Sequence, residues 1–372
     1  MILYLVVICL YSFLVYLSEK ARENGYYFLQ YMWLLVALLS ISVFAGIRNV
    51  QVGIDISTYG KNIFEATVSF GPKEAMLLYN RWGDIGYVYF NYLVSFFSAN
   101  INVYLGVLEF VIQFSFLLFF RKFREESSPA LSTLLFNFAT LPLTFSMLRQ
   151  SFAMAIAIWI IYFLIKNKVF KAALIGFVSI FFHKSSVIFI TIVFFVYIYS
   201  KIKEKIKEKK LVYFVFFVTA IISLLLIRFP EVVYLFIPNE GLSNIQQGNM
   251  GSFARLLLMF LPIIYFKLSN KEHFIRNNTD YFLYCICLLT IAFSWLSGIN
   301  YSITRFTNYL YPVYMLFIAK QARISGRIKV LIGLFIWGII ICWWLLARGN
   351  EGGVFPYTTY WQQFVPKEGI QK

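Results

Sequence analysis

The sequence predicts an all-α, polytopic integral membrane protein, and three observations support that fold class. Of the 372 residues, 60% are hydrophobic and only 13% are charged, whereas soluble domains carry about 25% charged residues. Continuous apolar runs of bilayer-spanning length recur from end to end, without the alternation typical of a transmembrane β-barrel. The formal net charge of +16 lies mostly in short linkers between these runs, which indicates contact with anionic membrane lipids and argues against a nucleic-acid partner.

About twelve transmembrane segments are expected, and two regions depart from simple spans. The first run begins at Ile2 with no basic residue before it, so we expect a retained helix and not a cleaved signal peptide. Residues 86–120 are too long for one straight span and are interrupted at 98–100, which predicts a tilted helix or a half-helix followed by a full one. Residues 172–199 are too short for two full spans, which predicts a broken or re-entrant pair with His183 near its apex. The expected segments are 2–18, 28–47, 86–120, 131–148, 151–165, 172–182, 187–199, 211–227, 255–268, 281–297, 306–319 and 330–347.

The orientation follows from where lysine and arginine accumulate. Lys20 and Arg22 place the first linker in the cytoplasm and the N-terminus outside. Alternation from there puts every strongly basic linker, including residues 201–210 and 320–329, on the cytoplasmic side. We therefore expect one transmembrane domain over 1–372, with long extracytoplasmic loops at 48–85 and 228–254 and an extracytoplasmic tail at 348–372.

Motifs for metals and nucleotides do not occur in the sequence. There is no Asp-x-Asp pair, Gly-rich phosphate loop, His-Glu-x-x-His or Gly-x-Ser-x-Gly. The four cysteines all lie within apolar runs and are expected to be small buried hydrophobes, not metal ligands or disulfide partners. No cofactor and no metal is predicted, so cationic side chains would have to take a metal's place in an enzyme.

Four short polar clusters lie at the ends of apolar segments, all on the predicted outer face. A cation at the membrane edge is costly unless it has a partner or a task, and arginine is the planar, bidentate binder of phosphate and carboxylate. These clusters therefore predict an anion site outside the membrane. They are Arg48-x4-Gly53-x-Asp55-x3-Tyr59, Arg149-Gln150, His183-Lys184-Ser185-Ser186 and Arg305-x3-Tyr309.

Each candidate residue also has a structural interpretation. Arg149 could extend to the lipid headgroups, and Arg305 could belong to an aromatic belt at the membrane interface. Asp55 could cap a helix or orient bound sugar, and Asp84 could cap a helix or act as a base. His183 could be a satisfied buried histidine, or a base, donor or local cation.

The ordered set of motifs resembles the EpsG-like branch of the Wzy polysaccharide polymerases, from about residue 30 to residue 320. At the position of Asp84 that family more often has glutamate. The resemblance implies a GT-C-like fold and metal-independent glycosyl transfer at the outer face of the bacterial cytoplasmic membrane. The motifs are Arg48-x4-Gly53-x-Asp55-x3-Tyr59, Asp84-x-Gly86-Tyr87, Arg149-Gln150-x2-Ala153, His183-x-Ser185-Ser186 and Arg305-x3-Tyr309-x2-Pro312.

The implied reaction transfers a glycan from polyprenyl pyrophosphate onto another lipid-linked repeat unit, and it assigns roles to these residues. The implied partners are that lipid-linked oligosaccharide, membrane lipids and a chain-length regulator of the assembly system. The leaving pyrophosphate needs cations, for which Arg149 and Arg305 are the candidates, with Arg48 third. His183 is the candidate base and Asp55 the second. The predicted substrate-binding residues are Arg48, Tyr59, Asp84, Gln150, Lys184 and Tyr309.

Three other functions fit the same sequence features. A transporter or flippase of lipid-linked oligosaccharide would hold pyrophosphate without breaking a bond, but it should expose cationic sites to both faces. A membrane acyltransferase built on a single histidine would need an acyl donor from the cytoplasmic side, which fits poorly with an external His183. A non-catalytic scaffold of a polysaccharide assembly complex is the third.

Overall fold

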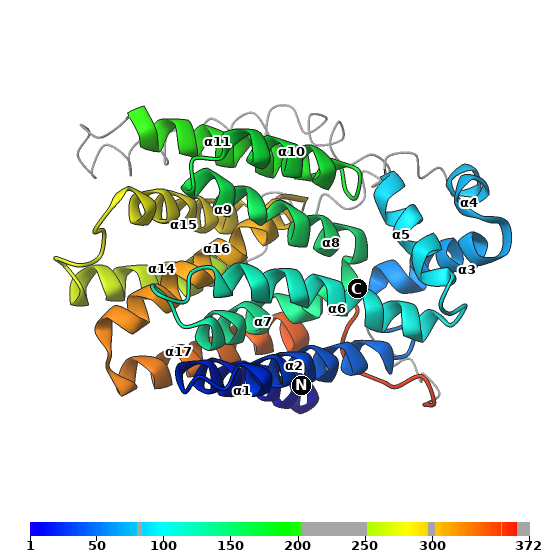
Figure 1. Ribbon diagram of the computed structural model, residues 1–372, viewed down its shortest axis with the longest axis horizontal. Helices are drawn as coiled ribbons and strands as arrows, with labels where there is room; N and C mark the ends of the chain where they lie inside the picture. Colours follow the sequence, from blue (N-terminus) through cyan, green and yellow to red (C-terminus); the bar gives the residue numbers. More distant parts are fainter. Residues whose placement is uncertain (80–83, 203–250, 297–301, 351, 363–372) are drawn as a thin grey trace. The chain divides into compact units, whose positions relative to one another are not determined.

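The computed structural model describes residues 1–79, 84–202, 251–296, 302–350 and 352–362, and every regular element within them is a helix (Figure 1). This confirms the predicted all-α class. In chain order the elements are α1 (Ile2–Glu23), α2 (Tyr27–Gly46), the π-helix η1 (Ile56–Gly60), α3 (Lys61–Phe70), α4 (Pro72–Leu78), α5 (Ile85–Ser95), α6 (Ile101–Arg121), α7 (Pro129–Ser146), α8 (Leu148–Ala157), α9 (Trp159–Ile165), α10 (Val169–Ile180), α11 (Ser186–Ile202), α14 (Gly251–Ser269), α15 (Asn278–Leu296), α16 (Ser302–Ser325), α17 (Ile328–Trp343) and the π-helix η4 (Trp344–Gly349).

Six stretches of the described chain are long and apolar enough to cross a membrane, so this is a polytopic membrane protein. The count of about twelve spans and the GT-C-like fold stay predictions. The expected span 211–227 lies outside the described residues, as do 228–250 of the predicted loop 228–254 and 363–372 of the predicted tail. The six stretches are Ile2–Glu23, Tyr27–Gly46, Ile101–Arg121, Leu148–Ile165, Asn278–Leu296 and Ile328–Ala347.

Both regions that departed from simple spans in the sequence are broken helices in the structure. Residues 86–120 form the short α5 followed by the full-length α6, as the half-helix alternative predicted. Residues 172–199 form α10 and α11, which are shorter apolar helices joined by a turn that contains His183. The predicted apex position of this histidine is confirmed.

The first helix shows how an apolar helix divides between a packed side and an outward side. Tyr4, Ile8 and Tyr11 of α1 are fully buried, and their spacing of three and four residues places them on one face. Ile2 and Phe13 are 75% and 55% exposed. Large exposed apolar side chains on a helix of this length are expected to contact lipid.

The predicted outer loop 48–85 is built largely of short helices. The π-helix η1 runs directly into α3, and α4 follows after Gly71, which has a φ of +89°. Pro72 occupies the first turn of α4, where its missing N–H costs nothing. The segment that carries Asp55 and Tyr59 is therefore regular backbone with fixed side-chain directions.

The chain divides into two compact units, and the prediction of a single transmembrane domain over 1–372 stays a prediction. Unit 1 comprises Met1–Phe114, Asn137–Phe152 and Ile339–Lys372, and unit 2 comprises Ser115–Phe136 and Ala153–Gly338. Within unit 1, α1 packs along α2, and α3 contacts α4 and α5 (Figure 1). Within unit 2, α15 packs against α14, α16 and α11, and α9 against α10.

Candidate functional site

Arg149 lies in the first turn of α8, where groups from two other segments of unit 1 hold its guanidinium. Its Nε donates to Tyr59 Oη at 2.9 Å, and its Cζ lies 4.5 Å from the centroid of the Tyr59 ring. Its Nη1 forms an ion pair with Asp84 Oδ2. The side chains of Arg149 and Asp84 are only 14% and 9% exposed, and hydrogen bonds to charged groups contribute about 1.5–3 kcal/mol. Three residues predicted from separate motifs are therefore in direct contact.

Asp55 completes this group, which we call the Arg149 cluster (Asp55, Tyr59, Asp84 and Arg149). Burial raises the pKa of Tyr59 well above its usual range, and the nearby Asp55 carboxylate acts in the same direction while Arg149 opposes it. The phenol is thus neutral and can donate a hydrogen bond at neutral pH. Asp55 and Asp84 occupy N-cap positions of η1 and α5, but neither side chain makes a capping hydrogen bond. The structure therefore does not support capping as their role.

Local backbone geometry explains the glycine of the first motif. Gly53 has a φ of +109°, a region that residues with a Cβ rarely adopt. A Cβ at this position would also collide with the carbonyl oxygen of Phe145. Both the positive φ and the lack of space for a Cβ thus require glycine at position 53. This turn sets the direction in which Asp55 and Tyr59 leave the backbone.

Arg48 lies in unit 1 but is closed off from solvent, with 1% of its surface exposed. Its Cζ lies 4.3 Å from the centroid of the Phe145 ring. Within the described residues, its Nε and Nη1 have no hydrogen-bond partner. Burial lowers the pKa of Arg48, and the charge of Glu109 gives the largest opposing contribution. The sequence predicted an anion contact for Arg48 in an outer loop, whereas in this conformation the guanidinium is inaccessible.

The contacts of Glu109 show what compensates a carboxylate inside α6. Its Oε1 accepts hydrogen bonds from Gln113 Nε2 at 2.8 Å and from Thr144 Oγ1 at 3.1 Å. Gln113 Nε2 also donates to Asn137 Oδ1 at 2.9 Å. Glu109 is 3% exposed, so these contacts offset a burial that would otherwise be very costly.

In unit 2, the turn between α10 and α11 forms a hydroxyl cluster with α16. Tyr309 Oη lies 3.1 Å from both Ser185 Oγ and Ser186 Oγ, and its ring stacks on Phe189 with centroids 5.3 Å apart. The backbone N–H of Ser185 donates to His183 Nδ1 at 3.4 Å. When Nδ1 accepts, the proton of the neutral imidazole is on Nε2. In that tautomer His183 offers a donor, whereas the sequence analysis favoured a base.

The remaining predicted residues lie in the same two units. Gln150 is buried beside Arg149 in unit 1. Lys184 is exposed. Arg305 is partly buried and lies one helical turn before Tyr309 on α16, so Arg305 and Tyr309 share a face of this helix. Unit 1 therefore holds Arg48, Asp55, Tyr59, Asp84, Arg149 and Gln150, and unit 2 holds His183, Lys184, Arg305 and Tyr309.

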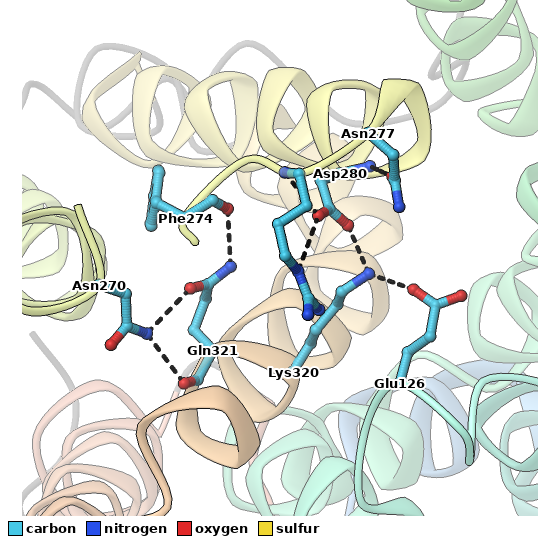
Figure 2. Close-up of polar contacts among 8 residues, drawn as sticks. Glu126, Asn270, Phe274, Asn277, Asp280, Lys320 and Gln321 are labelled. Atoms are coloured by element: carbon cyan, nitrogen blue, oxygen red, sulfur yellow. Dashed lines mark hydrogen bonds and ion pairs between the residues drawn. The ribbon is translucent and has the colours of Figure 1, made fainter. Parts of the chain in front are cut away.

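Unit 2 also contains a buried charge network around Lys320 that sequence reasoning missed (Figure 2). Lys320 Nζ forms ion pairs with Asp280 Oδ1 and Glu126 Oε2. Asp280 Oδ2 accepts the backbone N–H of Arg276 at 3.0 Å. Lys320 is 1% and Asp280 0% exposed. This Lys320 network ties the start of α15 and the linker after α6 to the C-terminal part of α16.

An amide network lies next to it on α16. Gln321 Nε2 donates to the carbonyl of Phe274 at 2.9 Å, and Asn270 Nδ2 donates to Gln321 Oε1 at 3.1 Å (Figure 2). The prediction that Lys320 begins a basic linker over 320–329 is wrong, because α16 continues to Ser325 and its side facing α15 stays buried. The apolar residues around Lys320 extend the helical pattern and could have indicated this.

The described residues contain no group of three or more His, Cys, Asp or Glu side chains that could hold a metal ion. All four cysteines are free thiols. Cys285, Cys287 and Cys342 are buried as predicted, whereas Cys9 is only partly buried.

Comparison with protein families finds a match that covers most of the chain. The sequence profile of the EpsG family matches residues 31–359. No curated protein and no solved structure matches. The matched range contains every candidate site residue named above.

Proposed function

The chain belongs to the EpsG family, and from that premise we propose that it is a polysaccharide polymerase of the bacterial cytoplasmic membrane. Its substrates are two lipid-linked glycans. The glycan on one polyprenyl pyrophosphate is transferred onto a second lipid-linked repeat unit, at the outer membrane face that the distribution of lysine and arginine predicts. The membrane-spanning helices fit substrates that are themselves anchored in the bilayer.

The observation that carries this proposal is the Arg149 cluster. A guanidinium held by a phenol on Nε and a carboxylate on Nη1 has a fixed plane, which bidentate binding of a phosphate group requires. Fixed donors stabilise the charge that develops on a leaving group without reorganising during the reaction. We assign Arg149 to the leaving pyrophosphate, with Tyr59 and Asp84 as the residues that position it.

The chemistry then needs one proton transfer. The bond between the sugar C1 and the pyrophosphate oxygen breaks, a bond forms between C1 and the acceptor hydroxyl oxygen, and the hydroxyl proton passes to a base. Asp55 carries a carboxylate beside Arg149 and is assigned as this base. His183, in the tautomer favoured by Ser185, is assigned as a donor to a substrate oxygen.

The other candidates are assigned to substrate binding. Arg305 and Lys184 supply positive charge for phosphate groups. Tyr309 and Gln150 are both 2% exposed in this conformation, so their role in substrate binding stays a prediction from the sequence. Pyrophosphate on both substrates creates a need for several cations.

The proposal is tested by incubating purified protein with lipid-linked repeat units and a metal chelator, and resolving the products by length. We expect elongated chains from the wild type and a loss of at least ~100-fold for Arg149→Ala, the size seen when one preorganised donor is removed. Arg149→Lys should also fail, because lysine cannot contact Tyr59 and Asp84 in one plane.

Arg327→Ala is the matched control, since Arg327 is an exposed arginine in the turn before α17, and it should elongate normally. A normal ladder from Arg149→Ala at wild-type protein level contradicts the assignment. Transbilayer movement of the lipid-linked glycan without elongation contradicts the polymerase function and favours a flippase.

A further inference from the structure

The C-terminal segment (residues 352–362) lies across the turn that carries Arg48, within unit 1. Arg48 and Thr359 form an isolated antiparallel bridge. The N–H of Asn49 donates to the carbonyl of Thr358 at 2.8 Å, and the N–H of Tyr360 donates to the carbonyl of Ile47 at 2.9 Å. Further along, the N–H groups of Gly53 and Ile54 donate to the carbonyls of Gly353 and Gly352, both at 2.9 Å.

The side chain of Tyr357 in this segment lies near the Arg48 guanidinium. Tyr357 stacks on Phe44 with centroids 4.3 Å apart and donates to its carbonyl at 2.5 Å. The carbonyl of Val354 accepts a hydrogen bond from Tyr4 Oη at 2.9 Å. Tyr4 and Tyr357 are both close enough to contribute to the electrostatics of Arg48. The surroundings of the buried Arg48 therefore include a segment that lies more than 300 residues further along the chain.

The covered guanidinium lacks the contacts that a buried cation needs. Its Nε and Nη1 have no hydrogen-bond partner among the described residues, and its planar face rests on Phe145. The carboxylate of Glu109 offsets part of the charge, but its Oε1 already accepts bonds from Gln113 and Thr144. Two N–H-bearing nitrogens are thus held inside the protein without acceptors in the described part of the chain, and each can donate to a separate oxygen of an anion.

The C-terminal segment has the features of a region that opens locally, without unfolding of the rest of the protein. It contains no helix of its own, and its end is exposed, with Tyr360 at 57% and Trp361 at 62%. Val354 is its one deeply buried apolar side chain, at 1% exposed. Segments with few buried apolar contacts open at much lower free energy than the whole fold.

We propose that Arg48 is an anion-binding residue that the C-terminal segment closes off, and that the segment moves aside to admit the pyrophosphate of a lipid-linked glycan. This inference rests on the proposed function, because that function supplies the pyrophosphate. The open form exchanges the phenol cover over Arg48 for phosphate oxygens on Nε and Nη1. Binding of the anion to Arg48 is thereby coupled to displacement of the C-terminal segment.

Locking the segment tests whether it must move. Asn49 Nδ2 donates to the carbonyl of Gln362 at 3.2 Å, so a cysteine pair at Asn49 and Gln362 can be joined by a short, reducible bifunctional thiol reagent in a variant that lacks the native cysteines. We expect elongation to fall by at least ~10-fold in the joined form, because a closed site cannot bind, and to return on reduction. Each single-cysteine variant is the control. Full elongation by the joined protein overturns the proposal.

A second measurement does not depend on elongation. In Val354→Cys, the rate of modification by a soluble maleimide reports opening, with the protein in neutral-lipid nanodiscs. Inorganic pyrophosphate should raise this rate by ~3-fold or more, since a ligand shifts the equilibrium toward the form it binds, and Arg48→Gln should remove the effect. An unchanged rate overturns the inference even if the wild type elongates glycans.

The same measurement separates the possible sources of the anion. A rise produced by nanodiscs of anionic phospholipid, with no further response to pyrophosphate, assigns the site to lipid headgroups and overturns the substrate assignment. A pyrophosphate-dependent rise in a protein that never elongates glycans leaves the closed anion site standing and contradicts the proposed polymerase function.

Discussion

Arg48 and Lys320 are both buried to 1% exposure, yet their surroundings are opposite. Lys320 pairs with two carboxylates, one of which accepts a further backbone N–H. Arg48 rests on an aromatic ring with two nitrogens that have no hydrogen-bond partner in the described part of the chain. A cation whose partners are complete belongs to the framework, whereas one whose partners are incomplete is suited to a ligand. Burial alone would have classed the two together.

Removing the framework cation should have the largest effect on stability. Lys320→Met leaves Asp280 buried at 0% exposure with its closer ion-pair partner gone and Arg276 Nε remaining at 3.8 Å. Breaking a buried pair from one side costs about 3–5 kcal/mol. We expect a clear fall in the midpoint of thermal unfolding in detergent. Lys329→Met, at an exposed position, is the control and should unfold like the wild type. An unchanged midpoint for Lys320→Met would remove the contrast between the two cations.

Arg48→Met should affect stability in the opposite direction. Replacing Arg48 with an apolar side chain removes the desolvation cost of a buried charge whose Nε and Nη1 have no hydrogen-bond partner among the described residues. Glu109 keeps its hydrogen bonds from Gln113 and Thr144 in this variant, so its burial stays compensated. We expect a thermal midpoint at or above that of the wild type, together with lost elongation. A marked loss of stability would show that Arg48 is a framework residue like Lys320.

The smallest effect is expected at the outer partner of Lys320. The side chain of Glu126 is 42% exposed, so solvent screens its ion pair and Glu126→Gln should cost less than about 1 kcal/mol. Asp280→Asn is the matched comparison at a buried position and should cost several times more. Equal losses from the two variants would mean that exposure does not rank the partners. Both are measured by chemical unfolding in mild detergent.

The lengths of the apolar runs and the polar interruptions between them predicted much of the fold. Residues 86–120 are too long for one straight span and are interrupted at 98–100, whereas residues 172–199 are too short for two full spans. These lengths located two helix breaks. The first break separates α5 from α6, and the second places His183 in a turn. These features depend on local sequence, so they could be inferred without knowledge of the tertiary contacts.

The contacts of the charged residues could not be predicted in the same way. Arg149 meets Tyr59 and Asp84 across 90 and 65 residues of chain, and Lys320 meets Glu126 across 194. A count of lysines and arginines treats each as exposed, and that assumption failed for Lys320. The family resemblance gave the order of the motifs along the chain, but it did not show that Asp84 would be the counter-ion of Arg149.

Gly53 and Gly352 differ in whether a second mutation in the same chain can compensate for their substitution. A side chain at Gly53 would strike the backbone carbonyl of Phe145, and no replacement at position 145 removes a carbonyl. At Gly352 of the C-terminal segment, the obstacle to a Cβ is the Ser146 side chain, with Cβ at 2.7 Å and Oγ at 3.0 Å. Loss of Gly352 thus has an intragenic suppressor in Ser146→Gly, while loss of Gly53 has none at the site of its collision.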